Sequence, residues 1–116
     1  MQILKTSIED LENNKKELYI LTKGVTKSVQ KLTDEELSDP HAVHGYVLYE
    51  EENARLEIVE VLAIKTDGFV LSTISATFKK EFFDIVDIMG DEPFAIRIIK
   101  GQTRGGRTFY TCALDI

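Results

Sequence analysis

The alternating run Phe94-Ala-Ile-Arg-Ile-Ile-Lys100 opens the most informative part of the chain, its last quarter. It continues through Gly101-Gln-Thr-Arg-Gly-Gly106 and ends with Arg107-Thr-Phe-Tyr-Thr-Cys-Ala-Leu114. Two runs with a period of two residues flank a short segment that holds three glycines and no acidic residue. This pattern predicts a β-hairpin with a flexible tip.

The predicted hairpin is a basic region on an acidic protein. Arg97, Lys100, Arg104 and Arg107 are basic, and no acidic residue lies between them, whereas the whole chain of 116 residues has a net charge of −6. Most of this negative charge lies in the first 60 residues. Phe109 follows the cations closely in the sequence. Because phosphates need neutralisation and bases stack on aromatic rings, this combination favours a nucleic-acid strand as the ligand.

Alternation within the hairpin assigns each side chain to one face of the sheet. The apolar face is predicted to point into the core and comprises Phe94, Ile96, Ile98, Tyr110, Cys112, Leu114 and Ile116. Arg97, Arg107 and Phe109 are then predicted to point outward together.

One amphipathic helix is predicted over residues 77–89. A single buried stripe with helical spacing consists of Phe78, Phe82, Ile85, Val86 and Met89. Thr77 is a candidate N-terminal cap, and Gly90 followed by Pro93 provides the stop signal.

Three strands in a meander precede this helix, over residues 42–52, 56–66 and 69–74. Asp67-Gly68 lies between the last two and is a typical hairpin turn.

The first part of the chain gives weaker signals. Residues 17–29 are interpreted as a first strand that is kinked at Gly24, because a glycine within a strand often marks a bend. Residues 30–40 are expected to form a surface loop, with one helical turn capped by Thr33. Residues 1–16 are expected to be a short helix or an arm docked on the body.

This order of elements predicts a mainly β fold in a single domain, residues 1–116. We expect an antiparallel Greek-key barrel of five to six strands that resembles the oligonucleotide-binding (OB) fold, with its one helix, about 77–89, before the last β-hairpin. An unrelated α+β roll is the structural alternative.

Four stretches carry a resemblance to a known family. They are Ser28-Val-Gln-Lys-Leu-Thr-Asp34, Asp67-Gly-Phe-Val-Leu-Ser-Thr-Ile-Ser75, Asp84-Ile-Val-Asp-Ile88 and Lys100-Gly-Gln-Thr-Arg-Gly-Gly-Arg-Thr-Phe109. Taken in this order, over roughly residues 17–116, the chain resembles small single-stranded DNA-binding proteins of phages. The resemblance is to those of lactococcal phages and, more distantly, of protein-primed Bacillus phages.

The resemblance implies an OB barrel that coats and protects single-stranded DNA (ssDNA) without sequence preference, in phage DNA replication or recombination. It also implies a homo-oligomer, a dimer or tetramer, in the cytoplasm of the bacterial host, with recombinase or replication proteins as further partners. The better-known bacterial homologues end in a disordered acidic tail. This chain ends with Thr111-Cys-Ala-Leu-Asp-Ile116 inside a predicted strand, so we expect no acidic tail to recruit partners.

Two groups of residues are predicted to bind ssDNA. The main group is Arg97, Lys100, Arg104, Arg107 and Phe109. The second group is Lys23, Lys27, Tyr46, Tyr49, Lys65 and Phe69. For the second group an ordinary structural role is the alternative, with each tyrosine a barrel residue and each lysine a solvated charge at a sheet edge.

Other kinds of site have little support. His41 and His44 could join a glutamate in a metal site, but residues three apart on a strand point to opposite faces, so no metal is expected. Cys112 lies in an apolar strand pattern, which predicts a buried, inert thiol. We find no nucleophile with a neighbouring base and no phosphate-binding loop, so neither an enzyme nor a cofactor is expected.

Charge and hydropathy leave one alternative function. The chain has no apolar run of the roughly 20 residues that a membrane span needs and no secretory signal, so we expect a cytosolic protein with no membrane partner. The negative charge of the first 60 residues is a typical solubilising surface. It also fits an acidic phage interaction module that binds a host protein rather than nucleic acid.

Overall fold

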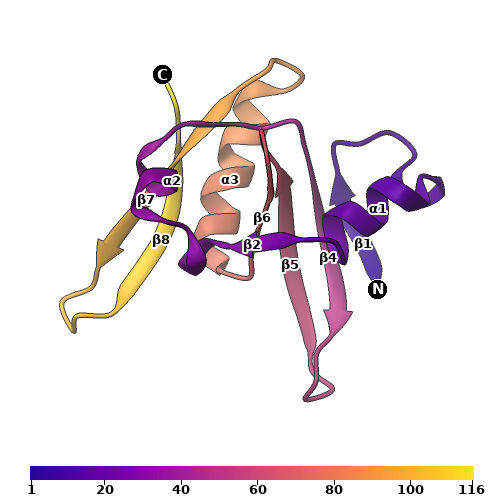
Figure 1. The fold of residues 1–116 in the computed structure, drawn as a ribbon, viewed down its shortest axis with the longest axis horizontal. Helices are drawn as coiled ribbons and strands as arrows, with labels where there is room; N and C mark the ends of the chain where they lie inside the picture. The colour runs from indigo at the N-terminus through magenta and orange to yellow at the C-terminus, as the bar shows by residue number, and fades with distance from the viewer.

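The computed structural model describes all residues, 1–116, and is mainly β, with eight strands in two sheets (Figure 1). The five-stranded sheet consists, in spatial order, of β1 (Gln2–Thr6), β4 (Gly45–Glu52), β5 (Ile58–Lys65), β6 (Val70–Thr73) and β2 (Thr26–Ser28). The three-stranded sheet consists of β3 (His41–Ala42), β7 (Ala95–Gln102) and β8 (Thr108–Leu114). β3 and β4 are nearly continuous, so one segment of the chain passes from the smaller sheet into the larger.

The meander and the closing hairpin are confirmed. β4, β5 and β6 pair antiparallel in sequence order, and β7 pairs antiparallel with β8. The predicted turn between β5 and β6 contains Gly68 with φ of +91°, and Thr66 donates its backbone N–H to the carbonyl of Phe69 at 3.0 Å. A positive φ of this size favours glycine, which is why the Asp-Gly pair marked the turn correctly.

The predicted helix is α3 (Ala76–Met89). Its cap is Ser75 rather than Thr77, because the Ser75 hydroxyl accepts a hydrogen bond from the Phe78 amide at 3.2 Å. Gly90, with φ of +60°, follows the last helical residue as expected. Phe78 and Phe82 of the predicted stripe are completely buried.

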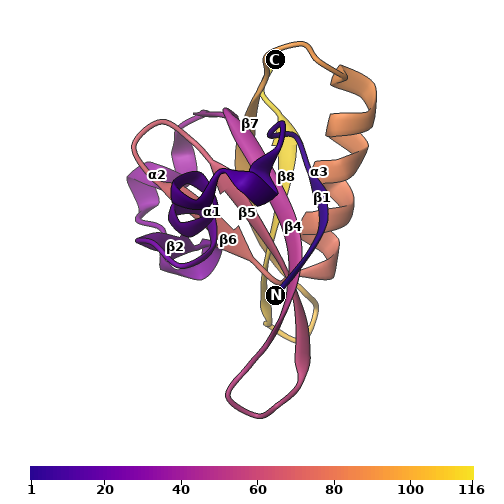
Figure 2. The same ribbon diagram turned by 90° about the vertical axis from the view of Figure 1, so that its right-hand side faces the viewer.

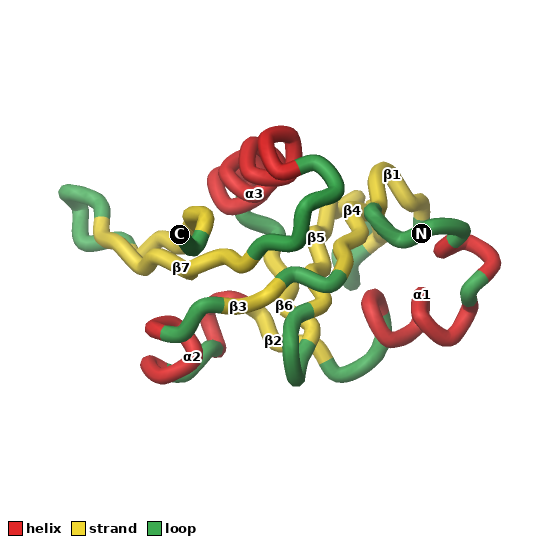
Figure 3. The backbone as a smooth tube through the Cα atoms, turned by 90° about the horizontal axis from the view of Figure 1, so that it is seen from above, coloured by secondary structure: helices red, strands yellow, loops and turns green.

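α3 lies between the two sheets and holds them together (Figures 1 and 3). The ring of Phe82 meets Tyr46 of the larger sheet edge-on, with ring centroids 5.4 Å apart. It also contacts Phe94, just before β7, at 6.3 Å. On the smaller sheet, Ile96, Ile98 and Cys112 belong to the same buried cluster, as the alternation of the hairpin predicted.

The kinked strand predicted over residues 17–29 is wrong. The structure has a helix, α1 (Lys15–Thr22), and then the short strand β2. The Asn14 side chain caps α1 by accepting a hydrogen bond from the Glu17 amide at 3.3 Å. Leu21 is completely buried against the face of the larger sheet that α3 does not cover. Gly24 lies just after the helix, where an added Cβ would lie 2.9 Å from the Ile20 carbonyl oxygen.

The beginning of the chain docks on the body as an arm, but as a strand rather than a helix. Residues 2–6 form β1, which pairs antiparallel with β4 at the edge of the larger sheet. A short 3-10 turn, Leu11–Asn13, follows, and Leu11 is buried beside Leu21.

The loop predicted over residues 30–40 contains the expected capped turn. It is α2 (Asp34–Ser38), where Thr33 and Glu36 form a reciprocal capping box. The Glu36 carboxylate accepts hydrogen bonds from the Lys27 ammonium and the Thr33 amide, and these contacts lower its pKa. Figure 2 shows α1 and α2 on the side of the molecule opposite α3.

The expected closed barrel of five to six antiparallel strands is not found. β6 already has β5 on one edge and the parallel strand β2 on the other, so no edge of β6 is left to pair with β8. A hollow of about 180 Å³ separates β6 from β8, lined by Val29, Gln30, Thr73, Ser75, Thr108, Phe109 and Tyr110. The two sheets are therefore joined by side-chain packing and by the continuous β3–β4 segment.

Because Phe82 joins the two sheets, Phe82→Ala should lower the free energy of unfolding by about 3–5 kcal/mol. Chemical denaturation followed by circular dichroism measures this loss. Ile88→Ala, in the same helix at a position that is 82% exposed, is the control and should change stability by less than about 0.5 kcal/mol. Equal losses in the two variants would contradict the role given to Phe82.

Candidate nucleic-acid interface

The tip of the β7–β8 hairpin is an ordered turn. The Thr103 amide donates to the Arg107 carbonyl, and the Gly106 amide donates to the Thr103 carbonyl, each at 2.9 Å. The Thr103 hydroxyl accepts a further bond from the Arg107 amide at 3.2 Å. Gly106 has φ of +81°, a conformation that side chains other than glycine rarely adopt. The turn places Arg104 and Arg107 at the end of the hairpin.

Three cations of the main predicted group are free of ion pairs. Lys100, Arg104 and Arg107 are exposed, and no carboxylate lies within 4 Å of their charged nitrogens. The fourth cation, Arg97, already forms an ion pair. Its Nε lies 2.6 Å from the Asp115 carboxylate, and its Nη1 donates to the carbonyl of Ser38 at 3.1 Å. Arg97 therefore holds α2 and the C-terminal residues against the hairpin.

The register of the hairpin separates these residues between its two faces. Arg97 pairs with Ala113 and Gly101 pairs with Phe109, which places Arg97 and Phe109 on the outer face. Lys100 pairs with Tyr110 and lies on the opposite face. The free cations of the hairpin are consequently distributed around its end rather than aligned along one side.

Phe109 lies against the backbone of Gly101. A Cβ added to Gly101 would lie 2.5 Å from a carbon of the Phe109 ring, so only glycine leaves room for the ring in this position. Phe109 as a residue is still 40% exposed. It is thus a supported aromatic surface, of the kind on which a nucleobase can stack.

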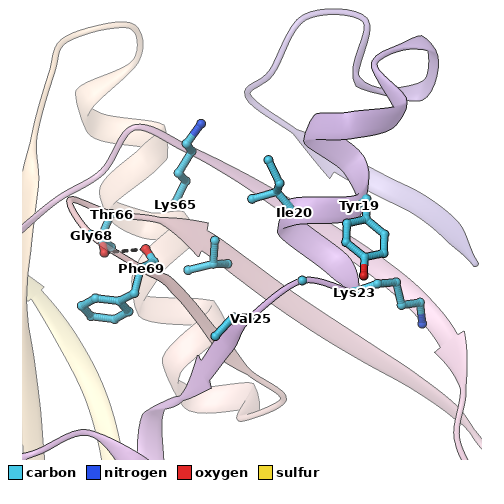
Figure 4. A pocket seen from close by; sticks show the side chains of 10 residues that line it. Tyr19, Ile20, Lys23, Val25, Lys65, Thr66, Gly68 and Phe69 are labelled. Atoms are coloured by element: carbon cyan, nitrogen blue, oxygen red, sulfur yellow. Dashed lines mark hydrogen bonds between the residues drawn. The ribbon is translucent and has the colours of Figure 1, made fainter.

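Three residues of the second predicted group come together in a groove beside α1. Lys23, Lys65 and Phe69 line it, and its volume is about 650 Å³. The other lining residues are Tyr19, Ile20, Gly24, Val25, Thr66, Gly68 and Val70. Figure 4 shows Phe69 and Tyr19 at opposite ends, with Val25 and Ile20 between them. Tyr19, Ile20 and Val25 were missed in the sequence because the segment that holds them was interpreted as a kinked strand.

The lysines of the second group all have acidic partners. Lys23 lies 2.6 Å from the Glu51 carboxylate, and Lys65 lies 2.8 Å from that of Glu17. Lys27 pairs with Glu36 and also lies over the ring of Phe69, 5.1 Å from its centroid. These charges are locally balanced, in contrast to the free cations of the hairpin.

The two tyrosines of the second group are buried. Tyr46 packs against Phe82 and Phe83 in the main core. Tyr49 packs on the other face of the sheet, where burial raises its pKa to about 12. Neither ring is accessible to a base in this structure.

The two histidines have separate partners. His41 is buried, and its ring nitrogen contacts the carbonyl of Glu36, whereas His44 is paired with Asp67. Across the whole chain, no three histidine, cysteine or acidic side chains gather in a way that could hold a metal ion.

Comparisons with protein-family models, curated proteins and solved structures yield no match to this chain. None of its helices is both long and apolar enough to traverse a bilayer.

The single thiol gives a direct test of the core on the hairpin side. Burial raises the pKa of Cys112 to about 12, and only a thiolate reacts readily with disulfide reagents. We expect labelling by a disulfide reagent at pH 8 to be at least about 100-fold slower in the native protein than in urea. Labelling at similar rates in both states would show that the hairpin does not pack on α3 as described.

Proposed function

We propose that this protein binds single-stranded DNA without sequence preference through the tip of its β7–β8 hairpin. The observation that carries the proposal is the combination of three cations without ion pairs, Lys100, Arg104 and Arg107, and a supported, partly exposed aromatic ring, Phe109. Coating and protection of single strands in phage replication or recombination, in the host cytoplasm, is the role that we propose for this activity.

The chemistry of these groups favours a single strand over a duplex. Guanidinium groups bind phosphate through two parallel hydrogen bonds, and this contact is independent of the base. Stacking on Phe109 needs a base whose face is free, which a duplex does not offer within its stack. No catalytic step is part of this proposal.

The strand order supports an open relative of the OB fold. The segment β3–β4 pairs with β5 and with β7, β5 pairs with β6, α3 follows β6, and β7 pairs with β8. A five-stranded OB barrel has the same strand order and is closed by one further pair, which would here be β6 with β8. In this protein β6 pairs with β2 instead. We infer that the β7–β8 turn corresponds to the loop between strands 4 and 5, which contacts oligonucleotides in such folds.

Binding to a labelled oligo-dT, measured by fluorescence anisotropy at several salt concentrations with a duplex control, tests the proposal. The variant Arg104→Glu/Arg107→Glu should bind at least about tenfold more weakly than the unaltered protein at low salt. The slope of the logarithm of the association constant against the logarithm of the salt concentration should decrease in magnitude. The decrease should be about 0.7 for each phosphate that the variant no longer neutralises.

The control is Lys15→Glu/Lys16→Glu, because these exposed lysines also lack ion pairs and the change in net charge is the same. It should bind oligo-dT with nearly the affinity of the unaltered protein. Absence of binding by the unaltered protein at low salt, or an equal reduction in both variants, would refute the hairpin site.

A second test uses the contact between Gly101 and Phe109. Gly101→Ala should displace the ring and weaken binding to oligo-dT as much as Phe109→Ala, by about 1–3 kcal/mol for one stacked base. The double variant should bind little more weakly than either single variant, since both changes remove the same stacking surface.

Gly105→Ala is the matched control. An added Cβ at Gly105 would have no atom closer than 3.9 Å, so binding should be unchanged. Unaltered binding by Gly101→Ala, or full additivity in the double variant, would show that Phe109 does not stack with the DNA.

A further inference from the structure

The hollow between β6 and β8 lies beside the candidate interface, because Phe109, whose ring rests on Gly101, also belongs to its wall. Its volume is about 180 Å³. This is well below the roughly 300 Å³ of the smallest ordinary ligand pockets. None of the seven residues that line it is charged. The hollow therefore suits a single small, neutral group and not a phosphate.

The edge of β8 at this hollow has unpaired backbone groups. The Asp115 amide donates to the Ala95 carbonyl at 2.9 Å, which fixes the pairs of the β7–β8 ladder that are hydrogen-bonded. Because bonded and non-bonded pairs alternate, Thr108 and Tyr110 belong to non-bonded pairs, and their N–H and C=O groups point away from β7. No group of the chain bonds them, and both residues line the hollow. A closed barrel would use this edge to pair β8 with β6.

β6 and the start of α3 supply hydroxyl groups to the same hollow. The Thr73 hydroxyl oxygen accepts a hydrogen bond from the Ser75 amide at 3.1 Å, and that of Ser75 accepts one from the Phe78 amide at 3.2 Å. Neither hydroxyl donates to another group of the chain, so both protons are available. The side-chain oxygen of Gln30 accepts from the Ser28 hydroxyl at 3.0 Å, which leaves the N–H groups of Gln30 free to donate.

We propose that this hollow takes one pyrimidine base of the bound strand, with its carbonyl oxygens directed at the hydroxyls of Thr73 and Ser75 and at the N–H groups of Gln30. A pyrimidine has a single ring, which suits the small volume. Thymine and cytosine carry carbonyl oxygens, whereas adenine has none. The base site rests on the proposed function, and it adds a preference at one nucleotide to a contact that is otherwise independent of sequence.

An extended peptide is the other ligand that an unpaired strand edge attracts. Such a peptide pairs along several residues of the edge. The next residue of β8 whose backbone groups point outward is Cys112, and it is only 4% exposed. The part of β8 that lines the hollow is limited to Thr108, Phe109 and Tyr110. This short edge favours a base, which needs only one donor and one acceptor.

Fluorescence anisotropy with labelled oligo-dT and oligo-dA of equal length tests the base site through the ratio of the two affinities. The self-stacking of oligo-dA is the same in every titration, so it does not affect the comparison between variants. Gln30→Met removes the N–H donors of an exposed side chain, and the preference for oligo-dT should fall about three- to tenfold, the effect of one hydrogen bond. Gln2→Met alters an exposed glutamine of β1 and is the control, with an unchanged ratio.

Ser75→Asp reverses the character of the hollow. Aspartate caps a helix as well as serine does, so α3 should remain intact and the Tm should not decrease. The carboxylate cannot donate a hydrogen bond, and its charge repels a base carbonyl. The preference for oligo-dT over oligo-dA should therefore be lost.

A second measurement does not depend on contacts at the hairpin tip. Thymidine 5′-monophosphate at millimolar concentration, added to the ¹⁵N-labelled protein, should shift the amide signals of Thr108 and Tyr110. Deoxyadenosine 5′-monophosphate should shift them much less, because adenine has no carbonyl oxygen.

An affinity ratio that is the same in Gln30→Met, Ser75→Asp and the unaltered protein would overturn the base site. So would amides of Thr108 and Tyr110 that do not respond to thymidine 5′-monophosphate. If these amides are silent and sedimentation velocity shows dimers, the edge of β8 pairs with a second copy instead.

The base site and the proposed function fail in different ways. If oligo-dT binding depends on Arg104 and Arg107 but the ratio does not change with the hollow, only the base site is refuted. Conversely, shifts at Thr108 and Tyr110 with the mononucleotide, in a protein that does not bind oligo-dT, refute only the proposed function.

Discussion

Two buried rings, Phe78 and Phe82 of α3, hold the two sheets of this protein together. No hydrogen-bonded strand pair closes a barrel, because β2 occupies the edge of β6 that β8 would need. The hairpin that carries the candidate interface is therefore fixed to the larger sheet by these rings and by the β3–β4 segment. Its inner residues, Ile96, Ile98 and Cys112, are buried against α3, and this leaves the tip free to project.

The distribution of ion pairs gives the acidic protein a local basic site. Lys23, Lys27 and Lys65 each have a carboxylate within 3 Å, and Arg97 is fixed by Asp115. The cations at the end of the β7–β8 hairpin have no such partner. A net charge of −6 therefore does not oppose a phosphate contact at this end, because charges at a distance are screened over about 8–10 Å in physiological salt.

Two hairpins thus extend from one core with opposite charge. The β7–β8 tip is basic and glycine-rich, and it supports an aromatic ring on Gly101. The turn between β4 and β5 carries Glu52, Arg55 and Glu57, and it holds Leu56 at a φ of +61°. Of the two, the β7–β8 tip is the one suited to a polyanion.

Much of the fold, and the placement of the main group of residues on the closing hairpin, could be predicted from the sequence where local signals agreed with tertiary packing. The Asp67-Gly68 turn, the apolar stripe of α3 and the alternation of the closing hairpin are signals of this kind. Residues 17–22 of α1 were mistaken for part of a kinked strand because Tyr19 and Ile20 favour strands. The helix depends instead on the Asn14 cap and on Leu21 packing against the sheet. The pairing of β2 with β6, which prevents closure of the barrel, cannot be inferred from either segment alone. The carboxylates that pair with the lysines and with Arg97 are likewise not adjacent in sequence. Only the structure therefore shows which cations have an acidic partner and which do not.

Our main proposal is that the free end of the β7–β8 hairpin is where this protein contacts a single strand. Titration of the ¹⁵N-labelled protein with oligo-dT, followed by NMR, tests it residue by residue. We predict that the largest amide shifts occur at Gly101–Phe109 and that residues 52–58 are unaffected by the DNA. Shifts absent from the β7–β8 hairpin, or centred on residues 52–58, would contradict the proposal.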